Sequence, residues 1–169
     1  YVGWTLSTTF NAGDARVSGM EFNVRHSLRG LGRWGSYFTL FANYTRLNLE
    51  GDQRASFNSF VPEVGNWGAS FNAKRLSATV RWNYRGEQQR GAIAGFGADG
   101  FEYYMARTTV DMNFSYQITR RISLAASVNN LFNEPQTLLR YGSETPKYAR
   151  EYQQAEFGVN LAAGIKGTF

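Results

Sequence analysis

Hydrophobic and polar residues alternate along most of this chain. In the stretch VDMNFSYQI, for example, Val110, Met112 and Phe114 are separated by polar residues. A period of two places successive side chains on opposite faces, which predicts β-strands. The pattern predicts eight strands, at residues 2–10, 15–28, 36–50, 62–73, 76–87, 103–118, 121–133 and 152–169.

The charged residues of the clearest segments fall on the polar parity. A soluble β-sandwich turns its polar face to water, whereas a membrane barrel turns its apolar face to lipid and its polar face to the lumen. Alternation alone does not distinguish the two. Residues 157–169 stay in phase over about 43 Å at about 3.3 Å per residue, and a tilted membrane strand needs only about 9–11 residues. On the membrane interpretation, the lumen-facing charged residues are Arg81, Asp111, Glu156 and Lys166.

On the same interpretation, the apolar parity faces lipid. The residues expected there are Phe22, Val80, Trp82, Phe114, Leu124, Leu161 and Ile165.

The connections between the predicted strands also favour a membrane barrel. Short ones at 29–35, 74–75 and 119–121 alternate with long ones at 51–61, 86–102 and 134–150. Short turns at one end and long loops at the other are typical of transmembrane barrels. The expected fold is therefore all-β: an antiparallel, up-and-down transmembrane β-barrel.

Composition limits the chemistry of the chain. Aromatic residues make up 16% of it, there is no cysteine, and His26 is the single histidine. We therefore expect no catalytic residues, no bound metal and no cofactor, and we expect that the protein is not an enzyme. The net charge of +5 comes from scattered basic residues, so nucleic acid is not an expected partner.

Two long connections carry arginines among aromatic residues, a combination that can stack on and pair with an anionic solute. The alternative is that these residues order the loops or contact lipopolysaccharide phosphates. The candidate substrate contacts are Arg90, Phe101, Tyr103, Tyr104, Arg140, Tyr141 and Tyr148.

The C-terminal stretch resembles a known family. Asn130, Leu131, Phe132 and Asn133 form an Asn-Leu-Phe-Asn run, followed by a loop and a last strand that ends on Phe169. This combination resembles the C-terminal end of TonB-dependent outer-membrane receptors. The stretches SGMEFNV (18–24) and FVPEVGNWGASF (60–71) resemble other strands of the same family. Gly167 departs from the pattern, which usually has a larger apolar residue there.

The resemblance implies a function and a location. Such receptors lie in the outer membrane of Gram-negative bacteria and take up a scarce solute, such as an iron chelate, cobalamin or a glycan, with energy delivered through TonB. Their barrels have about 22 strands around a plug. Residues 1–169 would then form one barrel region, the C-terminal part of a receptor, without the plug domain or the TonB box. The TonB complex would act through the missing N-terminal part.

The last strand resembles the signal read by the barrel-assembly machinery, with Phe157, Val159, Leu161, Ile165 and Phe169 on its apolar parity. Outer-membrane lipid and lipopolysaccharide are the other expected partners. Two alternatives stay open. One is a complete small eight-stranded outer-membrane barrel with a structural or binding role, and the other is a soluble ligand-carrying barrel.

Overall fold

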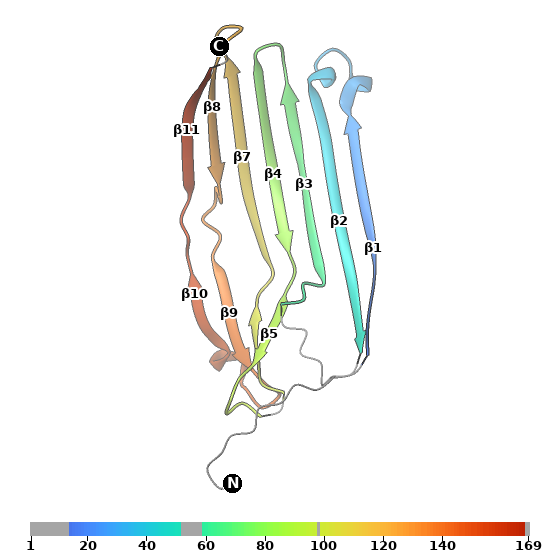
Figure 1. The fold of residues 1–169 in the computed structure, drawn as a ribbon, viewed down its shortest axis with the longest axis vertical. Helices are drawn as coiled ribbons and strands as arrows, with labels where there is room; N and C mark the ends of the chain where they lie inside the picture. Colours follow the sequence, from blue (N-terminus) through green and yellow to red (C-terminus); the bar gives the residue numbers. More distant parts are fainter. Residues whose placement is uncertain (1–13, 52–58, 98, 168–169) are drawn as a thin grey trace, which may run out of the picture.

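The computed structural model describes residues 14–51, 59–97 and 99–167. Most of these residues form one antiparallel sheet of seven strands, here called the wall sheet (Figure 1). Its strands, in spatial order, are β1 (Ala15–Ser27), β2 (Phe38–Gly51), β3 (Glu63–Asn72), β4 (Leu76–Arg85), β7 (Arg107–Gln117), β8 (Ile122–Asn129) and β11 (Asn160–Gly167).

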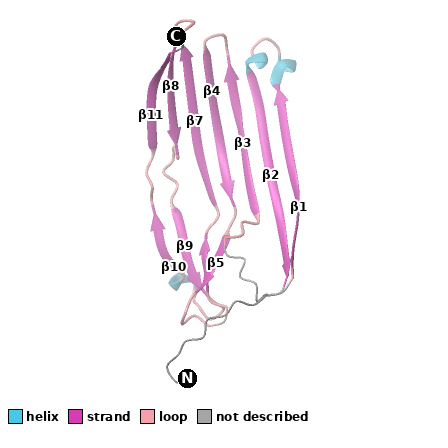
Figure 2. Cartoon of the chain, viewed as in Figure 1, coloured by secondary structure: helices cyan, strands magenta, loops and turns pink. Residues whose placement is uncertain are grey.

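A second, four-stranded sheet continues the wall sheet at the end opposite the short turns, and is here called the extension sheet (Figure 2). Each of its strands prolongs a wall strand along the chain: β5 follows β4, β6 precedes β7, β9 follows β8 and β10 precedes β11. The strand order is therefore the same in both sheets. The extension strands are β5 (Gln88–Ala92), β6 (Phe101–Tyr104), β9 (Gln136–Tyr141) and β10 (Glu151–Ala155).

The antiparallel, up-and-down order confirms the predicted fold class within the described residues. Among the described residues, neither sheet closes on itself. The expected strand 2–10 and the terminal Phe169 lie outside the described residues. β1 and β11 each have one edge without a strand partner among the residues described.

Four expectations about strand limits were wrong. The single strand expected at 103–118 is divided at residues 105–106 into β6 and β7, which belong to different sheets. The connections 86–102 and 134–150 are not simply loops, because β5, β9 and part of β6 lie within them. The strand expected at 121–133 ends at Asn129. The strand expected at 152–169 is interrupted at residues 156–159, where Gly158 has φ of 77° and so leaves the extended conformation.

The register joins the apolar residues of all seven wall strands into one continuous face. One row runs from Val24 through Ala42, Trp67 and Trp82 to Val110. The residues expected to face lipid all belong to this apolar face, as follows from the register of each neighbouring pair: Phe22, Val80, Trp82, Phe114, Leu124, Leu161 and Ile165. His26 lies on it as well, opposite Leu40.

The opposite, polar face includes Arg81, Asp111 and Lys166. Phe41, which breaks the alternation of β2, lies on this face in the row Phe41–Gly68–Arg81. The missing side chain at Gly68 leaves room for the aromatic ring, and the Arg81 guanidinium lies 5.7 Å from the ring centroid. The irregular residue of β2 therefore contacts a charged side chain two strands away.

The wall sheet is a single layer, so it has almost no conventional core. Val110 and Leu138 are the buried apolar side chains among the described residues, while Phe22, Leu161 and Ile165 are each more than 60% exposed. A contiguous apolar surface of this extent is typical of a face that meets an apolar phase or a partner.

Short 3-10 helices occupy the β1–β2 connection, at Leu28–Leu31 and Gly35–Tyr37, and the β9–β10 connection, at Lys147–Ala149. Within the described part of the chain, no helix has the length and apolar character needed to cross a membrane.

Candidate functional site

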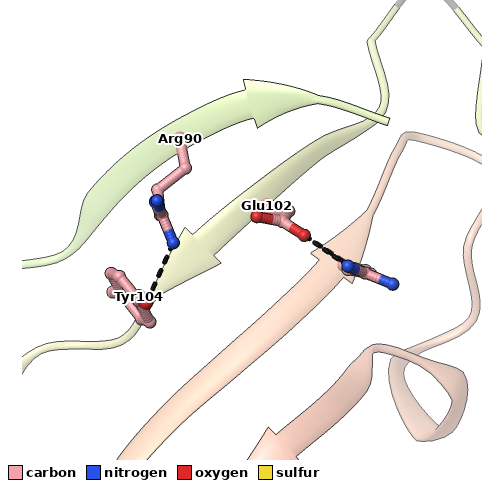
Figure 3. A network of polar contacts seen from close by, with 4 residues as sticks. Arg90, Glu102 and Tyr104 are labelled. Carbon is pink, nitrogen blue, oxygen red and sulfur yellow. Dashed lines mark hydrogen bonds and ion pairs between the residues drawn. The ribbon is translucent and has the colours of Figure 1, made fainter. Parts of the chain in front are cut away.

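The candidate site lies where the wall sheet meets the extension sheet. It is formed by arginine and tyrosine side chains on strands that run from one sheet into the other. Figure 3 shows Arg90 on β5 with Tyr104 on β6, and Glu102 on β6 with its partner. Tyr104 pairs with Leu138 and Glu102 pairs with Arg140, so Glu102, Tyr104 and Arg140 share one face of the extension sheet. The hydrogen bond from Arg90 to Tyr104 places Arg90 on the same face.

Arg140 and Glu102 form the ion pair of this face. Nε and an Nη of Arg140 donate to the same Glu102 oxygen at 2.9 and 2.6 Å. The Arg140 guanidinium also lies 3.3 Å from the centroid of the Tyr152 ring. The hydrogen bond to Glu102 raises the pKa of Arg140 above its ordinary value. The charge of Arg140 is thus already matched by a carboxylate.

Tyr104 has two arginines on its ring. Arg90 donates to the Tyr104 hydroxyl at 2.9 Å and lies 4.8 Å from the ring centroid. Arg85, at the end of β4, lies 5.5 Å from the same centroid and donates to Oε1 of Gln136 at 2.9 Å. Both cations therefore use neutral partners.

Arg107 lies directly opposite Arg85 in the β4–β7 register. Both belong to the polar parity of the wall sheet. Arg107 donates to the backbone oxygen of Glu134 at 2.8 Å, and its guanidinium lies 5.6 Å from the Phe157 ring. Two like charges that face each other across a strand pair are destabilising unless an anion lies near.

The structure separates the seven candidate substrate contacts. Arg90, Tyr104 and Arg140 share the face described above. Phe101, Tyr103 and Tyr141 alternate with them and lie on the opposite face of the extension sheet. The seventh, Tyr148, is 91% exposed in the last 3-10 helix.

The opposite face has its own aromatic contacts. The rings of Tyr103 and Tyr141 stack at 4.3 Å, and Arg150 lies 4.5 Å from the Tyr141 ring centroid. Burial raises the pKa of both tyrosines above the ordinary value, and the negative charge of Glu87 adds to the effect. These contacts join β6 and β9 on this face of the extension sheet.

The Asn-Leu-Phe-Asn run forms a corner between β8 and β9. Asn130 is buried and has φ of 54°, a conformation that asparagine tolerates better than most residues. Its backbone N–H donates to Asp111 at 3.0 Å, and its side-chain oxygen accepts from the Glu134 N–H at 2.9 Å. The corner is therefore held by its first residue.

The last residue of the run ties this corner to the break between β10 and β11. Asn133 donates to Glu156 at 2.9 Å and accepts from the Gly158 N–H at 2.9 Å. Glu156, Phe157 and Val159 therefore lie in or beside the break and not in a continuous strand. The expectation of one unbroken terminal strand was wrong because it did not include this corner.

Arg85, Glu102, Arg107, Gln136 and Tyr152 belong to the site but were not among the predicted residues. Arg85 and Arg107 fall at the ends of β4 and β7, two strands that are separated in the sequence by β5 and β6. The register that pairs them follows from strand pairing, which the alternation does not specify.

Among the described residues, no group of three or more His, Asp or Glu side chains could hold a metal ion. The family model described as TonB dependent receptor-like, beta-barrel matches residues 2–131. The chain belongs to this family. Proteins of the TonB-dependent receptor family are receptors and transporters of the Gram-negative outer membrane, not enzymes. No curated protein and no solved structure gave a significant match.

Membership in this family explains why the wall sheet has one apolar and one polar face. A TonB-dependent receptor barrel has an apolar face toward lipid and a polar face toward the lumen. The family match ends at Leu131, so the resemblance of residues 132–169 to the terminal part of such barrels rests on the Asn-Leu-Phe-Asn run and the alternation of the last strand.

Proposed function

We propose that this chain is the C-terminal barrel region of an outer-membrane receptor that takes up a scarce solute, such as an iron chelate, cobalamin or a glycan. Uptake is driven through the TonB complex, which acts on a plug and TonB box in the N-terminal part of the protein. The chain supplies the last strands of a larger barrel and its C-terminal assembly signal.

The observation that carries this proposal is the continuous apolar face of the seven wall strands. β1, β2 and β7 have 13, 14 and 11 residues, and a membrane strand needs about 9–11. At the extension end of the face, Arg46 and Glu63 pair at 3.6 Å, which places charge at the edge of the apolar band. Lipid against this face and water against the other explain both the apolar band and the charged pair at its edge.

The polar face suits contact with a plug. Small side chains on β4, β7, β8 and β11 line a hollow of about 370 Å³ there, including Ser77, Ser115, Ala125, Ser127 and Gly164. A wall with short side chains leaves room for another folded segment. Arg81, Asp111 and Lys166 on this face support the assignment of the lumen side.

The end of the chain supports recognition by the barrel-assembly machinery. Leu161 and Ile165 of β11 lie on the apolar face, opposite Val128 and Leu124. The other edge of β11 has no strand partner in the described part of the chain, and we expect it to pair with a further strand. A strand of this kind can add to a sheet edge through its backbone, while its apolar side chains supply affinity. Phe169 would then complete the signal.

Lipopolysaccharide is a proposed partner of the outer face of the extension sheet. Arg150, Tyr103 and Tyr141 lie together there, on the side that continues the apolar face. A guanidinium with neighbouring hydroxyl groups suits phosphate oxygens.

Uptake in cells tests the proposal. The receptor that carries this chain is expressed in a Gram-negative strain, and solute-dependent growth is compared in cells with and without TonB. Outer-membrane fractionation with TonB-dependent growth on one of the three solute classes supports the proposal. Growth that does not depend on TonB, with the protein inserted, contradicts it.

The alternative, a complete small barrel, makes a different prediction. In that case strand 2–10 pairs with β11, and paired cysteines in the two segments cross-link efficiently. In the larger barrel these edges pair with other strands, because unpaired amides are costly in lipid. Cross-linking between residues 2–10 and 160–167 of the inserted protein would favour the small barrel.

A further inference from the structure

We propose that Arg85, Arg90 and Arg107 form a binding site for the oxyanion groups of a soluble ligand, either carboxylate or phosphate. This inference rests on the proposed function, because it names the chemistry of the solute that the receptor takes up. The three residues are here called the arginine triad.

The first support is that no carboxylate of the described residues forms an ion pair with the triad. Among the described residues, ion pairs join Arg46 to Glu63 and Arg140 to Glu102, and none involves the triad. Glu134 contacts Arg107, but it does so through its backbone oxygen. The other partners are the Gln136 amide oxygen, the Tyr104 hydroxyl and aromatic rings.

The second support is the close placement of these charges. Arg85 and Arg107 are direct partners in the β4–β7 register, and Arg85 and Arg90 approach the same Tyr104 ring. Like charges that face each other in this way repel, and repulsion is relieved by an anion between them. The planar guanidinium offers paired N–H donors that match carboxylate and phosphate oxygens.

The third support is independent of charge. Two side-chain donors, Nε of Arg107 and Nε2 of Gln136, are buried and have no hydrogen-bond partner among the described residues. Gln136 accepts from Arg85 through its oxygen, so its free amide group adjoins the triad. Buried donors without acceptors are rare in native proteins. Both atoms are covered by neighbouring side chains, so they show that this cluster is short of acceptors, which an oxyanion bound beside the triad would supply.

The face on which the triad lies distinguishes a soluble oxyanion from a lipopolysaccharide phosphate. Arg85 and Arg107 belong to the polar parity of the wall sheet, the face opposite Val80, Trp82 and Val110. Lipopolysaccharide phosphates would lie against the other face. The ligand is therefore a soluble solute that reaches the polar side at the base of the extension sheet.

The test is a binding measurement on the purified receptor in detergent. Citrate and inorganic phosphate are the oxyanion probes, maltotriose is the neutral control, and purified lipopolysaccharide is the lipid-bound source. Arg85→Gln and Arg107→Gln are compared with Arg25→Gln, which removes the same charge from the polar parity of β1. Binding is followed by titration calorimetry, and circular dichroism confirms that each variant is folded.

We expect citrate or phosphate to bind the native receptor, and each triad variant to weaken that binding by about tenfold or more, since a charge-assisted hydrogen bond is lost. Arg25→Gln should leave the affinity unchanged. Three results would overturn the inference: no binding of either oxyanion, equal weakening by Arg25→Gln, or binding of lipopolysaccharide alone. If Arg85→Gln does not fold, Arg90→Gln gives the same comparison from the extension sheet.

The binding test and the uptake test fail separately. Calorimetry needs neither TonB nor a cell. Citrate binding without TonB-dependent uptake would therefore contradict only the proposed function. TonB-dependent uptake by a receptor that binds neither oxyanion would contradict only the arginine triad.

Discussion

The carboxylate of Asp111 accepts a hydrogen bond from the backbone N–H of Asn130, with the two atoms 3.0 Å apart. Its other oxygen accepts from the Asn83 side chain at 2.8 Å. One carboxylate on β7 thus holds both β4 and the corner that follows β8. This corner ends the wall sheet and begins the extension sheet, and so it sets where the arginine triad lies.

Replacing Asp111 by Ala should therefore destabilise the barrel region. The change leaves the Asn130 N–H and the Asn83 amide without their acceptor, at a cost of about 1–3 kcal/mol. Urea unfolding of the refolded receptor in detergent measures the effect. Asn113→Ala is the matched control, because Asn113 is an exposed residue two positions along the same face of β7. Equal losses in the two variants would contradict the role of the Asp111 contact.

Gly68 should not tolerate a methyl group. A Cβ atom there would overlap the Val80 carbonyl oxygen and lie 2.7 Å from Cζ of Phe41. We expect Gly68→Ala to cost about 1–3 kcal/mol through overpacking and displacement of the Phe41 ring. Gly164→Ala is the control, since nothing lies within 4 Å of the corresponding position. If both variants unfold at the same urea concentration as the native protein, the expected clash at Gly68 is contradicted.

A charge on the apolar face should be costly, whereas one on the polar face should not. Val80→Arg places a guanidinium among apolar neighbours, and the expected loss at mid-membrane depth is about 2–4 kcal/mol. Thr79→Arg, one position away on the polar face, is the matched control. Unfolding from lipid vesicles measures both. A larger loss for Thr79→Arg would mean that the faces are reversed.

The stacked tyrosines of the extension sheet should make stability fall at alkaline pH. The pKa values of Tyr103 and Tyr141 are raised in the folded protein, mainly by burial. Their stabilising effect is complete below the unfolded pKa of about 10 and is lost as pH rises through the folded values. Unfolding measured from pH 8 upward should show less alkaline loss in Tyr141→Phe than in the native protein. The exposed Tyr148→Phe should behave as the native protein does, and the reverse order would contradict the assignment.

The alternation of residues was sufficient to predict the wall sheet. The expected strand 62–73 corresponds to β3, and 15–28 to β1, each within one residue at either end. Period-two alternation works here because each wall strand is long and has one apolar face. β2 was predicted although Phe41 lies on the wrong parity. The structure accommodates the Phe41 ring beside Gly68, so the strand is not interrupted there.

The extension sheet and the triad could not be predicted in the same way. Extension strands are short, and both of their faces carry mixed polar and aromatic residues, so alternation gives no signal. The corner at Asn130 forms because the Asn130 side chain bonds to the backbone of Glu134. In the sequence, the same residues look like a continuation of the strand. Arg85 and Arg107 are opposite each other only because β4 pairs with β7, although β5 and β6 lie between these two strands in the sequence.

The membrane orientation of the wall sheet is tested most directly by measuring the environment of its two faces in a lipid bilayer. Spin labels are placed singly at Val80 and Leu161 on the apolar face, and at Thr79 and Ala162 on the polar face, in the receptor reconstituted in lipid vesicles. Oxygen reports lipid contact and a water-soluble nickel chelate reports water contact. We predict oxygen-dominated relaxation at Val80 and Leu161 and chelate-dominated relaxation at Thr79 and Ala162. The opposite order would contradict the membrane orientation and favour a soluble barrel.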